Sequence, residues 1–200
     1  SGRFESLPLA LEDACILQAA LDRGRGVLFV SAHLGPWEQV AASVVAAGFP
    51  VTTIARQSYD PRLTAIYDTL RGKHGVRSIY RGAAGASVRA MRHLRSGRML
   101  GVVMDLKSRV QSISAPFFDH DAPTAVGPAR LALRTGAQVV VASAASAENK
   151  ALRITVTSID SSDLRPGADG EHELTGRINA EISRRVRALP DRWVWMHPRF

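Results

Sequence analysis

The stretch that decides the fold is residues 26–38, which read GVLFVSAHLGPWE. Its first six residues are mostly apolar and predict a short buried strand. Gly35 and Pro36 suit a turn that leads into a helix, because proline fixes φ and the first helical turn does not need its N–H. We therefore expect His33 at the carboxyl end of a strand and Glu38 in the first turn of the following helix.

Side chains on the two sides of a strand-to-helix turn can meet, so His33 and Glu38 are candidates for a working pair. A helix N-terminus favours a charged carboxylate. An ionised carboxylate beside a neutral histidine is the arrangement that removes a proton from a hydroxyl group. On spacing alone, a loop histidine followed by a helix-capping glutamate is the more common explanation.

Outward from this stretch, apolar runs typical of strands alternate with helical patterns along the whole chain. Such alternation predicts an α/β sandwich with a mixed, largely parallel sheet flanked by helices. No repeat or linker divides the chain, so we expect a single domain over residues 1–200. The expected strands are 26–31, 51–55, 76–80, 99–104, 138–143 and 152–159; the expected helices are 8–22, 36–47, 61–74, 84–96, 125–135 and 171–189.

Polar side chains follow several of these strands. In open α/β sheets, ligands bind beyond the carboxyl ends of the strands. His33, Arg56 and Asp105 each follow an expected strand, so parallel strands would bring them to one edge. Arg56 and Arg81 can bind phosphate there, because a guanidinium reaches two phosphate oxygens at once; a solvated loop position is an equal alternative for each. Asp105 can orient an arginine or His33, or simply cap a loop.

Composition indicates a globular chain with a sizeable core, since 46% of its 200 residues are hydrophobic and 22% are charged. The single cysteine, Cys15, excludes an intrachain disulfide, and the six histidines show no metal-site spacing. No run of about 18 apolar residues is present to span a bilayer.

The formal net charge of +8 points to acidic partners. Three kinds of partner compete: nucleic acid, an anionic membrane surface, and acidic substrates such as an acyl carrier protein or a phosphorylated glycolipid. No nucleic-acid motif is present and aromatic residues are few, so nucleic acid is not expected.

The stretch HLGPWE at 33–38 resembles the His-x4-Asp/Glu box of the bacterial lipid A biosynthesis acyltransferases, a branch of the lysophospholipid acyltransferase-like superfamily. Three further blocks are similar to that family in the same order: PFF at 116–118, GPARLALRTGA at 127–137 and LPDRWVWMHPRF at 189–200. Arg71 and Gly75 also stand where the family places an arginine and a glycine. The resemblance covers nearly the whole chain.

The chain departs from the family pattern at several positions. Pro36 replaces a common asparagine, and Asp105 stands alone where the family usually has Asp-x-Asp. Asp119 replaces a frequent glycine, and the chain ends in His-Pro-Arg-Phe instead of His-Arg-Arg-Trp. These differences indicate a divergent member of the family.

The resemblance implies transfer of a fatty acyl chain from a thioester to a hydroxyl of a membrane glycolipid, with a lipid A precursor as the expected acceptor. In this scheme His33 is the general base, Glu38 fixes its tautomer, and Arg71 stabilises the oxyanion. Trp37 joins Arg56, Arg81 and Asp105 as expected substrate-binding residues. A surface position on its helix is the plain alternative for Arg71. Trp193 and Trp195 are expected in packing, and His197 in a structural hydrogen bond.

No metal or redox cofactor is implied; the co-substrate is an acyl carrier protein or coenzyme A thioester. The expected setting is the cytoplasmic face of the bacterial inner membrane, reached peripherally or through an N-terminal anchor before residue 1, by a protein that acts as a monomer. A glycerophospholipid or phosphatidylinositol-mannoside acyltransferase is the alternative enzyme. A non-catalytic lipid-binding module of the same fold is the alternative from another class.

Overall fold

The computed structural model describes residues 5–146, 151–197 and 199–200. Its elements run in the order α1 (Leu11–Asp22), β1 (Val27–Ser31), α2 (Trp37–Ala46), β2 (Val51–Ala55), α3 (Pro61–Lys73), β3 (Arg77–Tyr80), α4 (Ala86–Arg95), β4 (Met99–Val103), β5 (Ser112–Phe117), β6 (His120–Ala125), α5 (Gly127–Thr135), β7 (Gln138–Ser146), β8 (Leu152–Ile159) and α6 (Ala168–Ala188), followed by a 3₁₀ turn, Pro190–Arg192.

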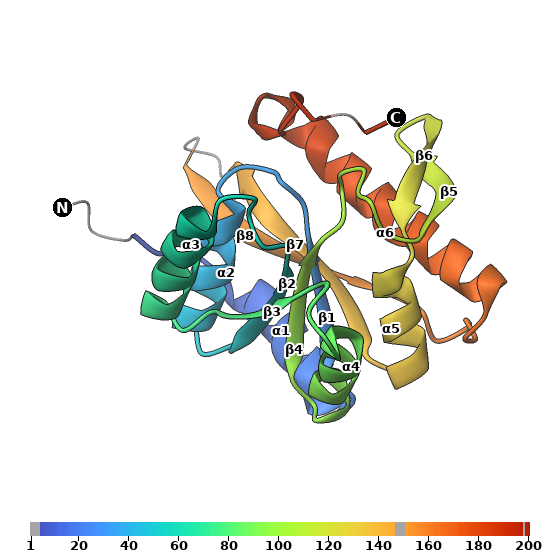
Figure 1. Ribbon diagram of the computed structural model, residues 1–200, viewed down its shortest axis with the longest axis horizontal. Helices are drawn as coiled ribbons and strands as arrows, with labels where there is room; N and C mark the ends of the chain where they lie inside the picture. Colours follow the sequence, from blue (N-terminus) through green and yellow to red (C-terminus); the bar gives the residue numbers. More distant parts are fainter. Residues whose placement is uncertain (1–4, 147–150, 198) are drawn as a thin grey trace.

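The central sheet has the strand order β3-β2-β4-β1-β7-β8 (Figure 1). Every neighbouring pair is parallel except β7 and β8, which are antiparallel. The expected α/β fold with a mixed, largely parallel sheet is confirmed. All five residues of β1 are buried, because β1 has a strand on each side and helices on both faces.

The core has two layers, one on each face of the sheet. Alternate residues of β1 point to opposite faces, as strand geometry requires. Val27 and Phe29 pack with α1 and α2, whereas Leu28 and Val30 pack with α4, α5 and α6. Helix α6 closes the second layer with four buried residues at helical spacing, Leu174, Ile178, Ile182 and Val186, as its sequence predicts.

The sequence patterns predict no strand or helix between residues 105 and 124, whereas the structure has two strands there. Strand β5 instead pairs with β6 in an antiparallel hairpin that turns at Phe118, whose φ is +53°. Pro116 and Pro123 make this hairpin hard to recognise in the sequence, because proline within a run of residues argues against a strand. Both strands of a two-stranded sheet are edge strands, so a proline with no N–H can be accommodated.

Two helices leave apolar side chains of one face exposed. In α4 the buried residues are Ala90 and Leu94, whereas Val88 is 58% exposed. In α3 no residue is buried, although its apolar residues lie on one side of the helix. The other helices and strands begin or end within a few residues of their expected positions.

Candidate active site

His33 and Asp105 meet because their strands are neighbours. Strands β1 and β4 run parallel with Ser31 opposite Val103, and each candidate residue stands two positions beyond that pair. His33 Nδ1 lies 2.8 Å from Asp105 Oδ1, and the backbone N–H of His33 donates to Asp105 Oδ2 at 2.9 Å. The strand register therefore fixes both the backbone and the ring of His33 against one carboxylate.

The carboxylate of Asp105 is fully buried and accepts a third hydrogen bond, from Trp193 Nε1 at 2.7 Å. Three donors around a buried carboxylate satisfy it as an anion. An ionised Asp105 accepts a hydrogen bond from the Nδ1–H of His33, so the other ring nitrogen, Nε2, keeps a free lone pair. The expected partner for this role was Glu38, so the pairing predicted from the spacing of five residues is corrected. Asp105 was also expected to contact substrate, and its complete burial contradicts that.

The C-terminal segment holds the turn that carries His33. Leu34 forms an isolated antiparallel bridge with Trp193, and Gly35 N–H donates to the carbonyl of Arg192 at 2.9 Å. Gly35 has φ +61°, a conformation that glycine adopts without strain. Trp193 is buried, as expected, whereas Trp195 is 60% exposed.

Glu38 binds Arg71 instead of His33. Arg71 Nε donates to Glu38 Oε2 at 2.9 Å, and Arg71 Nη2 donates to Oε1, so the pair is bidentate. Arg71 Nη1 also lies 3.4 Å from the hydroxyl of Ser78. The hydrogen bonds from Glu38 raise the pKa of Arg71, which stays charged. The side chain of Arg71 is only 16% exposed, so it is not a free surface arginine.

A cavity of about 1040 Å³ opens beside these residues. Six of the seven predicted site residues line it, namely His33, Trp37, Glu38, Arg56, Arg71 and Arg81. Trp37 stands edge-on to the ring of His33, with ring centroids 4.9 Å apart. Apolar side chains also line the cavity, among them Ile54, Ile79, Val102 and Leu131, which pack against the core layer on the α4, α5 and α6 face of the sheet. The cavity thus joins a histidine–carboxylate pair to an apolar interior.

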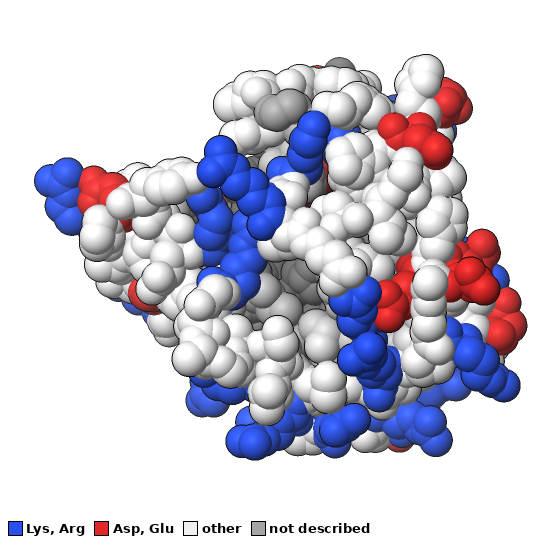
Figure 2. Space-filling view, turned by 45° about the vertical axis from the view of Figure 1, so that its right-hand side comes forward, with Lys and Arg blue, Asp and Glu red and all other residues white. Residues whose placement is uncertain are grey.

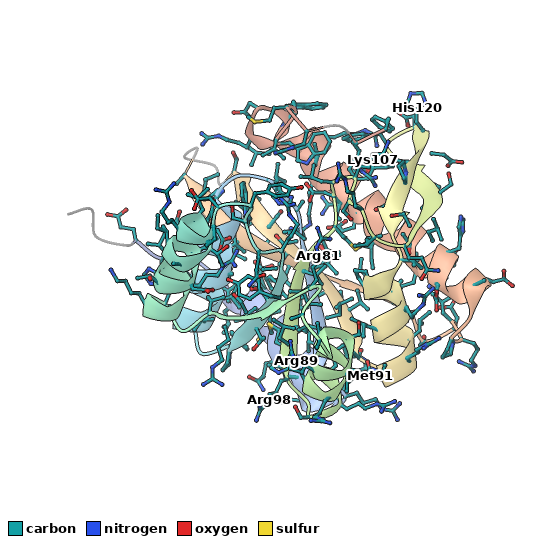
Figure 3. All side chains as sticks on the ribbon, in the orientation of Figure 1. Arg81, Arg89, Met91, Arg98, Lys107 and His120 are labelled. Carbon is teal, nitrogen blue, oxygen red and sulfur yellow. The ribbon has the colours of Figure 1, made fainter. Side chains whose placement is uncertain are left out.

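One rim of the cavity is basic. Arg56 and Arg81 each follow a residue of the pair Ala55–Tyr80 in the β2–β3 register, which brings them to the same edge. Burial, followed by repulsion from Arg56, lowers the pKa of Arg81. Figure 2 shows Lys and Arg side chains gathered across the middle of one face, beside a hollow. In Figure 3, Arg81 and Lys107 lie toward the carboxyl ends of the strands, whereas Arg89 and Arg98 lie lower in the view.

Tyr59 and Arg109 extend this basic rim. The guanidinium of Arg56 lies 4.4 Å from the centre of the Tyr59 ring. A hydrogen bond from Arg56, together with the charges of Arg56 and Arg109, lowers the pKa of Tyr59. Arg109 also lines the cavity. No sequence pattern indicated Arg109, because it lies in a loop whose position depends on the hairpin.

Arg199 is a supporting residue that the sequence did not single out. It is 3% exposed, donates to the carbonyl of Pro123 and to Thr124 Oγ1 at 2.7 Å each, and lies 4.2 Å over the ring of Phe117. Burial lowers its pKa to about 10, and the negative charge of Asp105 opposes that shift. The family-like ending of the chain was the available signal for this residue.

The site as a whole has the arrangement of a general-base centre that can activate a hydroxyl group. Residues 3–200 match the family described as bacterial lipid A biosynthesis acyltransferase, and the chain belongs to that family. Compared with individual curated proteins, the chain gives no significant match. The protein is accordingly an acyltransferase of the lipid A biosynthesis type.

No group of three or more His, Cys, Asp or Glu side chains in residues 5–146, 151–197 and 199–200 is placed to hold a metal ion. Over the same part of the chain, no helix combines the length and apolar character needed to cross a bilayer.

Proposed function

We propose that this protein moves a fatty acyl chain from a thioester, carried by acyl carrier protein or coenzyme A, to a hydroxyl of a lipid A precursor. The family supports acyl transfer in general. The observation that carries the proposed chemistry is the contact between His33 Nδ1 and the buried carboxylate of Asp105, beside a large cavity.

In the first step His33 Nε2 takes the proton of the acceptor hydroxyl, and the oxygen attacks the thioester carbon. The carbonyl π electrons move to oxygen and give a tetrahedral oxyanion. Asp105 keeps the ring in the tautomer with Nδ1–H and stabilises the imidazolium that forms. When the oxyanion collapses, the C–S bond breaks and His33 returns the proton to the leaving sulfur. The products are an ester and a thiol.

We assign the developing oxyanion to Arg71, which has N–H groups beyond those that bind Glu38 and Ser78. Preorganised donors at such a position typically contribute a few kcal/mol to catalysis. Glu38 then acts as the residue that orients Arg71 and limits its motion. Backbone N–H groups near Gly35 are further candidate donors.

The basic rim supports an anionic substrate. Arg56 and Arg81 have the chemistry to hold a phosphate of the glycolipid or of the donor's prosthetic arm. Trp37 stands edge-on to His33 and lines the same cavity, so it limits the space beside the ring. The apolar walls suit an acyl chain. We place the reaction at the cytoplasmic face of the inner membrane; proteins of this family are generally membrane-associated.

The test is an assay of the purified protein with a labelled acyl–acyl carrier protein and an under-acylated lipid A precursor, followed by mass spectrometry of the lipid. His33→Ala should lower the transfer rate by about 10²–10⁴-fold, the usual contribution of a general base. His172→Ala is the matched control, because His172 is exposed and bonds the carbonyl of Ser114. Near-normal transfer by the His33 variant would refute the proposal.

The same assay separates the alternatives. Acylation of a glycerophospholipid or of a phosphatidylinositol mannoside, with no product from the lipid A precursor, would assign the enzyme to a different acceptor. Absence of both transfer and thioester hydrolysis would indicate a lipid-binding module. The close contact of His33 with Asp105 favours the catalytic alternatives.

A further inference from the structure

Helix α3 presents its apolar side to solvent. Leu63, Ile66, Tyr67 and Leu70 follow the i, i+3, i+4, i+7 spacing of one helical face, and they are 47%, 53%, 46% and 50% exposed. A surface helix of a globular protein normally turns such a face toward the core. We call these four side chains the α3 stripe.

The polar side of α3 makes the contacts to the rest of the protein. Arg71 binds Glu38 of α2, Thr64 Oγ1 accepts the backbone N–H of Ser58 at 2.9 Å, and Tyr80 of β3 donates to Asp68. These bonds fix the rotation of α3 about its axis, so they hold the stripe toward solvent. In Figure 1, α3 lies at the margin of the molecule, away from α4 and α5.

Cationic side chains flank the stripe. Arg62 and Lys73 are exposed on α3 itself, and Arg62 also binds Asp60. Tyr67 belongs both to the stripe and to the lining of the cavity, where Arg56 and Arg109 lie. An apolar face bordered by basic residues is the pattern of a helix that lies in a membrane interface.

We propose that α3 is an interfacial helix that inserts its stripe into an anionic phospholipid leaflet and sets the cavity mouth against that surface. Basic residues near an anionic surface contribute attraction, and the stripe adds apolar burial. The inference rests on the proposed function in one respect, that the acceptor is a membrane lipid. Tyr67 belongs both to the stripe and to the lining of the cavity, so it connects the surface that would face the leaflet with the site.

The chain offers a direct probe of insertion. Its single cysteine, Cys15, is exposed on α1. Helix α1 packs on β7 and β8, whereas α3 packs on β3 at the opposite edge of the sheet, so an environment-sensitive fluorophore on Cys15 reports on a different surface from the stripe. The matched probe is Ile66→Cys in a Cys15→Ser background. Vesicles of phosphatidylglycerol and phosphatidylethanolamine should shift the Ile66 probe to the blue and leave the Cys15 probe unchanged. Phosphatidylcholine vesicles should give little response at either site.

Vesicle sedimentation tests the contribution of the stripe. The double variant Ile66→Ser/Leu70→Ser should weaken partitioning to anionic vesicles by about tenfold or more, because it removes two large apolar side chains from the inserted face. Leu11→Ser/Val88→Ser removes two exposed aliphatic side chains on α1 and α4 and should leave partitioning unchanged. High salt should release the protein, since the electrostatic part is screened.

Several outcomes would overturn the inference. These are equal responses at both probe sites, no binding to anionic vesicles, or equal loss in the two double variants. A concentration-dependent shift of the Ile66 probe without vesicles would assign the stripe to a second copy of the chain. Transfer to a detergent-dispersed acceptor distinguishes this failure from failure of the proposed function, because that assay requires His33 and needs no bilayer.

Discussion

At the scale of single residues, the carboxylate that orients His33 depends on strand order. Glu38 is close to His33 in sequence, yet Asp105 reaches Nδ1 because β4 lies next to β1. The sequence placed both carboxylates near the carboxyl edge of the sheet. It could not choose between them, because spacing along the chain does not reveal which strands become neighbours.

Asp105→Asn tests this assignment. The amide oxygen can occupy the Oδ2 position and still accept from His33 N–H and Trp193, so the fold should persist. The amide nitrogen would then donate to Nδ1 and force the proton onto Nε2, which removes the base. We expect kcat to fall by about 10²–10⁴-fold with little change in thermal unfolding, measured by steady-state kinetics and circular dichroism.

Glu38→Gln serves as the comparison for Asp105→Asn. Its effect should be smaller, because Glu38 binds Arg71 and not His33, so it acts on the reaction only through the residue assigned to the oxyanion. If Glu38→Gln abolished transfer while Asp105→Asn left it intact, Glu38 and not Asp105 would be the residue that orients His33.

At the scale of elements, the buried faces followed hydrophobic periodicity where a helix covers the sheet and departed from it elsewhere. Ile178 and Ile182 of α6 follow that periodicity and are buried, since α6 packs on β7 and on β5 of the hairpin. In α3 the same periodicity is present, but polar contacts decide which side faces inward. Periodicity identifies the apolar face of a helix but does not indicate which element will pack against that face.

The pair Glu38–Arg71 links α2 to α3, and a double-mutant cycle measures that link. Glu38→Gln and Arg71→Gln each leave a partly buried partner unpaired, so each should destabilise the protein. The double variant should be less destabilised than the sum of the two, with a coupling of about 0.5–3 kcal/mol by urea unfolding. Strict additivity would show that the bidentate contact does not hold α3 in place.

At the scale of the whole molecule, a buried ionic network ties α6 to β7 and β8. Arg185 donates to Ser143, Thr155, Thr157 and the carbonyl of Val141, and it also binds Glu181. Burial alone would raise the pKa of Glu181. Hydrogen bonds from Arg184, Thr157 and Arg185, with the charge of Arg185, outweigh burial and lower that pKa to about 2.

Because folding lowers the pKa of Glu181, its stabilisation is present above the unfolded pKa of about 4.5 and is lost as pH falls toward 2. A shift of this size corresponds to about 3 kcal/mol near neutral pH. Glu181→Gln should therefore lower the free energy of unfolding by that order, and its difference from the native protein should narrow progressively in acid. Urea unfolding at a series of pH values measures this.

Glu173→Gln is the control on the same helix. Glu173 forms an exposed i,i+4 pair with Arg177, and such surface pairs contribute at most about 1 kcal/mol. If the difference in free energy of unfolding between Glu181→Gln and the native protein did not narrow in acid, the assignment of the low pKa to this network would be contradicted.

The overall class of the fold was accessible from sequence, because apolar runs such as Met99–Val103 and the helices between them alternate regularly. The hairpin was not, because Pro116 and Pro123 make its strands hard to recognise. The support from Arg199 was not, since it depends on contacts between segments about 75 residues apart. Local patterns carry information about elements, whereas these contacts are set only when the elements assemble.

The tie between the last segment and the first strand has a consequence for protein synthesis. Trp193 Nε1 donates to Asp105, which stands 88 positions earlier in the chain. Trp193 also forms a bridge with Leu34, in the turn that follows β1. A ribosome delivers the chain from the amino end, and early elements can begin to assemble while later ones are unmade. The bonds from residues 192 and 193 to Asp105 and to the turn after His33 can form only once these residues have emerged, so a shorter nascent chain lacks that support of the site.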